Sequence, residues 1–224
     1  MKTAHRKGAV FMSAAFDSIL AELERLYPDA KPALHFANPY QLLVAVILSA
    51  QCTDVKVNAV TPALFAAYPD AHALAKADPL EVEGYIRTCG LYHNKAKNLV
   101  ATARALVEHY GGEVPADHEK LTQLPGVGRK TANVVMSCAF GADAIAVDTH
   151  VFRVSNRLGL ADAGDVLKTE QQLMQNIPKN KWSLAHHWII FHGRRVCSAR
   201  KPDCERCTLS AWCEYAHGNP KGKK

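Results

Sequence analysis

The stretch LPGVGRKTANVV, residues 124–135, is the part of the sequence from which the fold and the function can be worked out. Pro125 and Gly126 predict a turn, and Gly128 follows two residues later. Glycines this close together let the backbone bend and point several N–H groups outward. A helix that opens near Lys130 adds the free N–H groups and positive dipole of its N-terminus. The stretch therefore predicts an anion site built of backbone, which suits a phosphate. The simpler alternative is a glycine turn between two helices.

Size and composition indicate a folded, helical protein. The 224 residues suffice for one large or two modest domains, and 48% are hydrophobic. Apolar side chains recur at helical spacing, and no stretch alternates like a strand, so we expect an all-α fold. No apolar run approaches the roughly 20 residues that a membrane span needs. We interpret residues 1–15 as a disordered basic tail. The expected helices cover approximately residues 16–27, 39–50, 79–90, 93–110, 117–121, 130–140, 148–158, 165–176 and 182–196, and a further helix is expected to begin at residues 53–54.

The positive charge is concentrated near the C-terminus. The net charge is +6, and residues 178–224 hold ten Lys or Arg against three Asp or Glu. A basic segment of this kind predicts a polyanionic partner. A solvated basic tail is the alternative for the final lysines, whereas Arg200 and Lys201 lie inside a cysteine-rich segment.

Four of the seven cysteines form one cluster with the spacing C-x6-C-x2-C-x5-C: Cys197, Cys204, Cys207 and Cys213. An odd number of cysteines, most of them clustered, is not a secreted disulfide framework and favours a reducing cytoplasm. Four thiolates this close can hold one metal centre. The spacing alone leaves structural zinc and an iron–sulfur cluster equally open.

Two charged residues suit catalysis but also have simpler interpretations. Asp148 follows the apolar run AIAV and precedes a helix, so it is an expected N-cap. Lys130 is an expected solvated lysine near a helix start. Its amine could act as a nucleophile only after it loses its proton.

Three motifs together resemble the endonuclease III family of DNA glycosylases. They are the hairpin LPGVG followed by Lys130, the segment VDTH that contains Asp148, and the cysteine spacing. The resemblance extends from roughly Leu20 to Tyr215. It implies two helical domains with a DNA-binding cleft between them. Residues 32–142 would form a six-helix domain with the helix-hairpin-helix, and residues 16–31 plus 143–224 a cluster domain.

The resemblance also implies an activity. Such enzymes are bifunctional glycosylase/abasic-site lyases that excise oxidised pyrimidines from duplex DNA in base excision repair. Carried onto this sequence, Lys130 and Asp148 are the catalytic residues. The four clustered cysteines are expected to hold one [4Fe–4S] cluster.

Several residues are expected to contact DNA. The hairpin residues Gly126, Val127 and Gly128 would hold a phosphate through their backbone. The resemblance places Gln51 and Leu91 in loops that enter the duplex, although a capping glutamine and a core leucine are the simpler interpretations. We expect further contacts from three polar residues: Arg200, Lys201 and His150. Asp203 stands where related proteins often have a basic residue, which weakens the expected phosphate site.

Two other functions would explain part of the pattern. An adenine-mismatch glycosylase of the same superfamily shares the hairpin and the cluster but usually lacks a lysine at position 130. A non-catalytic DNA-binding protein with a zinc-stabilised tail would leave Lys130 and Asp148 as coincidence. We expect a monomer in the cytoplasm, associated with the nucleoid, that binds damaged double-stranded DNA and no membrane.

Overall fold

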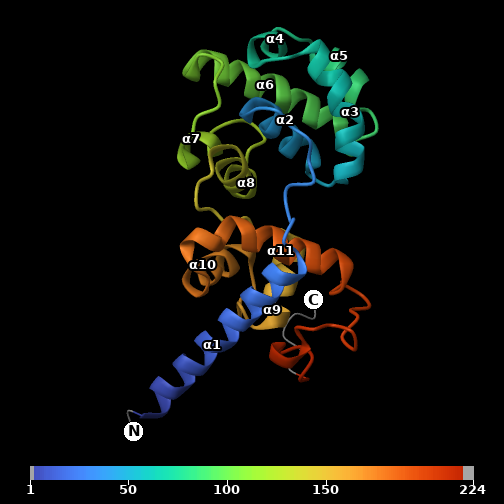
Figure 1. The fold of residues 1–224 in the computed structure, drawn as a ribbon. Coiled ribbons are helices and arrows are strands. Elements are labelled where there is room, and N and C mark those ends of the chain that lie inside the picture. The colour runs from blue at the N-terminus through green and yellow to red at the C-terminus, as the bar shows by residue number, and fades with distance from the viewer. Residues whose placement is uncertain (1–2, 219–224) are drawn as a thin grey trace. The chain divides into compact units, whose positions relative to one another are not determined.

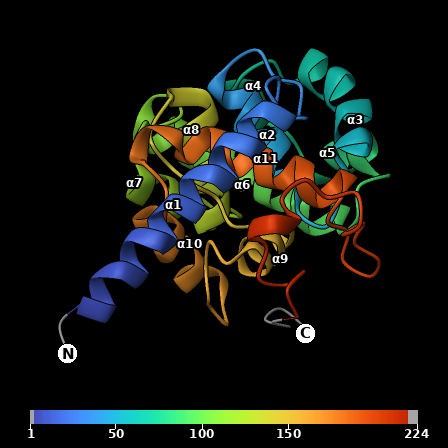
Figure 2. The same ribbon diagram turned by 60° about the horizontal axis from the view of Figure 1, so that its bottom comes forward.

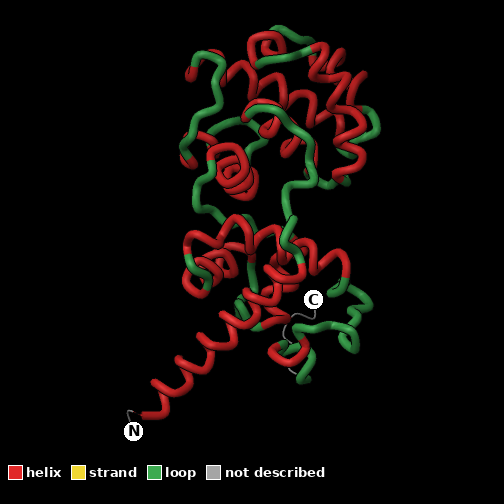
Figure 3. Tube along the Cα trace, in the orientation of Figure 1, coloured by secondary structure: helices red, strands yellow, loops and turns green. Residues whose placement is uncertain are grey.

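The fold is helical throughout residues 3–218, the part of the chain that this computed structural model describes (Figure 1). Figure 3 shows helices joined by loops, and no strand occurs among those residues. The expectation of an all-α protein is confirmed. Within the same range, no helix is both long and apolar enough to cross a membrane.

The chain forms two compact units. One comprises residues 32–142, and the other combines the described residues up to Lys31 with those from Asp143 onward. The inserted unit holds seven helices: α2 (Pro39–Ser49), α3 (Asp54–Ala67), α4 (Ala71–Ala75), α5 (Pro79–Ile86), α6 (Tyr92–Tyr110), α7 (His118–Thr122) and α8 (Arg129–Phe140). This is one more than the six expected, because Asp70 accepts a hydrogen bond from the Ala73 N–H and so starts the short α4.

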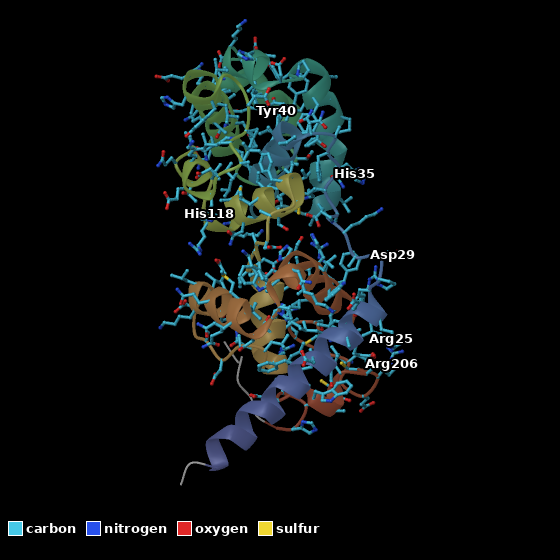
Figure 4. All side chains as sticks on the ribbon, turned by 60° about the vertical axis from the view of Figure 1, so that its left-hand side comes forward. Arg25, Asp29, His35, Tyr40, His118 and Arg206 are labelled. Carbon is cyan, nitrogen blue, oxygen red and sulfur yellow. The ribbon has the colours of Figure 1, made fainter. Side chains whose placement is uncertain are left out.

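Helix α2 is the centre of the inserted unit. Asn38 caps it by accepting a hydrogen bond from the Gln41 N–H at 2.9 Å, and Pro39 occupies the first turn. Residues 42–48 are all buried, so this helix is apolar on every side, and it packs against α3, α6 and α8. Tyr40, labelled in Figure 4, donates a hydrogen bond from its hydroxyl to the Tyr68 carbonyl at 3.1 Å.

The other unit has its own core around α11. Its elements are α1 (Thr3–Leu26), α9 (Thr149–Leu158), α10 (Val166–Asn176), η1 (Lys179–Lys181), α11 (Trp182–Arg195) and η2 (Ser210–Trp212). Helix α11 packs on α9 and on α1, which crosses it in Figure 2. Ile19 and Leu23 of α1 are buried in the same core as Trp188 of α11. The N-terminal helix is therefore part of the unit that the C-terminal half forms.

The start of the chain differs from the expected disordered tail over residues 1–15. Helix α1 already begins at Thr3, whereas Met1 and Lys2 lie outside the described residues. Residues 3–15 contain no proline and several alanines, the strongest helix former, so nothing in the sequence stops the helix that begins at the core from continuing toward the N-terminus.

Candidate functional site

The hairpin between α7 and α8 is fastened to α6. Gly126 has a φ of 74°, in the left-handed region that favours glycine. A Cβ built there would meet the Asn98 side chain at 3.0 Å. The Thr102 hydroxyl donates a hydrogen bond to the Pro125 carbonyl at 2.5 Å. The turn is thus held by conformation, by close packing and by a hydrogen bond from a neighbouring helix.

The far side of the same hairpin faces outward. Gly128 is the N-cap of α8 with a φ of −90°, and no atom lies within 4 Å of a Cβ built on it. Val127 between the glycines is 5% exposed and belongs to the core, so only its backbone can serve a ligand. Lys130, the second residue of α8, is exposed. The open backbone and the amine therefore lie on one short segment.

Asp148 caps α9 in the other unit. Its Oδ1 accepts a hydrogen bond from the Val151 N–H at 2.7 Å, so the expected N-cap is present. The residue is half-buried, and Oδ1 is the oxygen that fixes the start of the helix.

Polar groups around Asp148 are held in place by the segment that follows α11. His150 Nδ1 lies 3.2 Å from Arg153 Nη2, and the same guanidinium donates to the Gly193 and Cys197 carbonyls at 3.0 Å each. Burial lowers the pKa of His150 and outweighs the opposite effect of nearby Asp148. We therefore expect a neutral imidazole at neutral pH, able to make a hydrogen bond but not an ion pair.

Gln51 and Leu91 come together in the inserted unit, although they are 40 positions apart in the sequence. Both have a positive φ, 51° and 59°, which is unusual for side chains of this size. They line one pocket, in which a Cβ on Gly90 would lie 3.3 Å from the Gln51 carbonyl oxygen. Leu91 is 55% exposed, which rules out the core leucine, and Thr53 rather than Gln51 caps α3.

The four clustered cysteines line a single cavity below the end of α11. They are free of disulfides, and burial together with the neighbouring sulfurs raises the pKa of Cys207 and Cys213. Within residues 3–218 no three His, Cys, Asp or Glu side chains are grouped as a single metal ion would require. A lone zinc would draw its four sulfurs to about 3.8 Å of each other, from Zn–S bonds of about 2.3 Å.

The basic loop after Cys197 is secured by Arg157 of α9. Its guanidinium donates to the Ser198 and Ala199 carbonyls at 2.8 and 2.9 Å and to Cys197 Sγ at 3.3 Å. Arg157 is 5% exposed, whereas Arg200 and Lys201 on the loop are exposed. The loop thus presents two cations on an ordered backbone.

The acidic residue of this loop has a partner of its own. Asp203 pairs with Arg206, whose Nε donates to Oδ2 at 2.7 Å, and this hydrogen bond lowers the pKa of the carboxyl. Arg206, labelled in Figure 4, therefore neutralises the charge that was expected to weaken phosphate binding here.

Comparison with known proteins identifies the family. Residues 44–179 match the HhH-GPD superfamily of base excision DNA repair proteins. An endonuclease III from Synechocystis sp. is 52% identical over 202 residues, which cover 90% of this chain and 92% of that protein. This chain belongs to the endonuclease III family. The endonuclease III of Bacillus subtilis is 48% identical over 206 residues, covering 92% of this chain and 93% of that one.

Solved structures agree with this membership. A trapped endonuclease III–DNA covalent intermediate has a TM-score of 0.88 and 48% identity to this endonuclease III family member. The likeness covers 92% of this chain and 97% of that one. The resemblance stated from the three sequence motifs is therefore confirmed, and with it the helical fold.

Some residues of this endonuclease III family member were not foreseen as parts of the site. Asn98 and Thr102 of α6 support the hairpin, and Arg153 and Arg157 of α9 support the cysteine segment. The two arginines could have been noticed in the sequence. In the segment FRVSNRL they lie four residues apart, one helical turn, on a helix that is otherwise buried. Asn98 and Thr102 left none, since their partners are 23 or more positions away.

Proposed function

We propose that this chain excises oxidised pyrimidines from duplex DNA and then cleaves the strand through a covalent intermediate on Lys130. Membership of the endonuclease III family makes it a DNA glycosylase and abasic-site lyase of base excision repair. The hairpin segment is the observation that supports the finer assignment. The backbone at Gly128 faces outward and carries no side chain, and the exposed Lys130 follows two residues later. A phosphate bound to that backbone would bring its own sugar to the amine.

Lys130 supplies the nucleophile in this proposal. Its unprotonated Nζ attacks C1′ of the damaged nucleotide, and the bond from C1′ to the base breaks, with the base leaving with the bonding electrons. The attached nitrogen then loses a proton, and the C1′–O4′ bond of the sugar ring breaks as O4′ takes up a proton. The open-chain iminium that results makes the C2′ proton acidic. Its removal breaks the C3′–O bond by β-elimination, which cleaves the strand on the 3′ side, and water finally releases the sugar from the lysine.

Asp148 assists at the same sugar. Its Oδ1 is engaged as the cap of α9, so Oδ2 is the oxygen proposed to stabilise positive charge at C1′ and to accept a proton. The covalent endonuclease III–DNA intermediate among the related structures supports chemistry of this type for that relative.

The damaged nucleotide must leave the base stack before this chemistry can occur. We propose that Gln51 and Leu91 fill the gap that this nucleotide leaves in the stack. The two residues line one pocket, and both are exposed. The glutamine amide can pair with the orphaned base, and the leucine can fill space as an apolar wedge. Arg200, Lys201 and His150 are proposed to contact the backbone of the same duplex.

The cysteine cavity is proposed to hold one [4Fe–4S] cluster, bound by Cys197, Cys204, Cys207 and Cys213. Such a cluster would cross-link the C-terminal segment and steady the basic loop, with no part in bond cleavage. Elemental analysis of purified protein is expected to give iron and sulfide and a yellow-brown colour. One zinc per chain and no iron would contradict this assignment.

Partner and location follow from the same proposal. We infer that the protein works as a monomer on damaged duplex DNA, in the cytoplasm with the nucleoid.

The test uses a duplex with one thymine glycol and a label on the damaged strand. The wild-type protein is expected to release the base and leave a strand cut with the 3′ product of β-elimination. Lys130→Gln should lose both activities, whereas Lys120→Gln, an exposed lysine of α7, is the matched control. Strand cutting by Lys130→Gln at the wild-type rate would overturn the assignment.

A further inference from the structure

Two of the remaining cysteines, Cys52 and Cys89, lie in the pocket that Gln51 and Leu91 line. Each is placed by a turn that follows a helix. The Cys52 N–H donates to the Ser49 carbonyl at 3.1 Å, and the Cys89 N–H donates to the Ile86 carbonyl at 2.9 Å. The pocket thus joins the end of α2 to the end of α5.

The two cysteines are neighbours in this pocket. The backbones of their two loops approach so closely that a Cβ on Gly90, next to Cys89, would lie 3.3 Å from the carbonyl oxygen of Gln51, next to Cys52. Both cysteines are free thiols, 37 residues apart in the chain. Cys52 is half-buried and Cys89 fully buried, so an agent that enters the pocket reaches Cys52 first.

A buried lysine without a partner accompanies this pair. Lys95 of α6 is 4% exposed, and its Nζ has no hydrogen-bond partner among the described residues. Burial lowers its pKa, while the adjacent Cys52 and Cys89 act in the opposite direction. An ammonium in this position has no counter-charge while the thiols are protonated, and it gains one when either becomes a thiolate.

We propose that Cys52 and Cys89 are a reversible modification site, which small disulfides oxidise to a disulfide bond that clamps the two loops expected to enter DNA. The Cys52 thiolate attacks one sulfur of a compound such as oxidised glutathione and releases one thiolate. The Cys89 thiolate then displaces the second. The two cysteines lose two electrons and two protons, which the small disulfide takes up to become two thiols.

The bond changes the loops that carry Gln51 and Leu91. A disulfide draws the sulfurs to about 2.05 Å, far closer than two unbonded thiols approach each other. Because Gln51 precedes one cysteine and Leu91 follows the other by two residues, the clamp narrows the pocket and restricts both side chains. We expect the oxidised protein to bind damaged duplex several-fold more weakly, and a thiol reductant to restore the affinity.

The chemistry is tested on the full-length protein without DNA. Reduced protein is treated with oxidised glutathione, alkylated and digested, and the unreduced peptides are mapped by mass spectrometry. The expected product is a Cys52–Cys89 cross-linked peptide. The Cys89→Ala variant should instead retain glutathione on Cys52, and Cys138→Ala, a matched change in α8, should cross-link like the wild type. Glutathione that stays on Cys52 of the wild type, or no reaction, overturns the proposal.

The role of Lys95 has a separate readout. Lys95→Met keeps the length and burial of the side chain but removes the charge, so the rate of cross-linking should fall. Lys97→Met, an exposed lysine on the same helix, should leave the rate unchanged. An unchanged rate in Lys95→Met would contradict its assistance to the thiolate.

The expected effect on DNA binding rests on the proposed function. A separate measurement distinguishes an error in that function from the absence of the disulfide. Bound duplex with an abasic-site analogue should slow cross-linking, because Gln51 and Leu91 would then be covered. Equal rates with and without DNA, or equal DNA affinity of both redox forms, would remove the link to insertion while the mapped disulfide stands. Absence of the disulfide in free protein would remove the pair and leave the glycosylase assignment untouched.

Discussion

Gly126 and Gly128 lie in the same turn, but glycine is needed at each position for a different reason. Gly126 needs to be glycine for the fold, because of its φ of 74° and the Asn98 side chain beside it. Gly128 has an ordinary φ and open space around it, so its lack of a side chain serves something outside the protein. We therefore expect substitutions at the two positions to separate stability from DNA binding.

Alanine substitutions should show this separation. Gly126→Ala is expected to lower the free energy of unfolding by about 1–2 kcal/mol, the cost of placing a side chain in the left-handed region. Gly128→Ala should leave stability within about 0.5 kcal/mol but weaken binding to duplex DNA by about 1.5 kcal/mol, because a methyl group blocks the approach of a phosphate. Chemical denaturation and DNA titration measure the two. A Gly128→Ala variant with full affinity would contradict the phosphate site.

His187 makes stability depend on pH. Burial lowers its pKa from 6.5 to about 3, and His186 beside it adds to this effect. The unfolded chain therefore takes up a proton near pH 6.5 while the folded chain does not. This contribution to stability is complete above pH 6.5 and is lost as the pH falls toward 3, by an amount on the order of several kcal/mol. His187→Gln should make the free energy of unfolding depend less on pH between 3 and 6.5. An unchanged slope in this range would contradict the role of His187.

Among the helices, α9 positions two separate parts of the candidate site. Its first turn holds Asp148 as a cap, and Arg153 and Arg157 on later turns fix the chain around Cys197. Arg157 also stacks over the Tyr215 ring at 4.6 Å. A single helix thereby connects the carboxylate proposed to be catalytic with the loop that bears Arg200 and Lys201.

Removing Arg157 should loosen that loop. Arg157→Met is expected to cost about 2–3 kcal/mol of stability, because the Ser198 and Ala199 carbonyls lose charge-assisted hydrogen bonds from a buried guanidinium. It should also increase the loss of iron during purification. Arg206→Gln, whose side chain is 85% exposed, is the matched control and should change stability by less than about 1 kcal/mol. Equal stability of the two variants would show that Arg157 does not hold the loop.

The whole molecule consists of two units with separate cores. The core of residues 32–142 takes its buried side chains from that range alone. The other core combines the helix that ends at Leu26 with residues after Asp143, so it is discontinuous in sequence. Insertion of one unit into the other allows each to be tested by itself.

A fragment of residues 32–142 should therefore fold alone. We expect a helical circular dichroism spectrum and one cooperative melting transition. Residues 143–224 should lack such a transition without α1, because Ile19 and Leu23 fill their core, and should regain it when a peptide of residues 15–31 is added. A non-cooperative 32–142 fragment would contradict the independence of this core.

Most of the fold could be predicted from the sequence, but the contacts that support the candidate site could not. Helical periodicity and caps such as Asn38 are local, so they predicted most helices correctly. The motif around Lys130 is also contiguous. The contacts from Thr102 to the hairpin and from Arg157 to the cysteine segment join distant positions, and residue type alone does not identify the partner. The helical start of α1 was missed because a basic composition resembles a tail.

The central claim is that Lys130 is the nucleophile, and borohydride trapping tests it most directly. Wild-type protein is incubated with a thymine glycol duplex and sodium borohydride, which reduces a Schiff base to a stable amine. The account predicts a covalent protein–DNA adduct whose digest carries the sugar remnant on Lys130, and no adduct with Lys130→Gln. An adduct mapped to another residue, or undiminished trapping by Lys130→Gln, would contradict it.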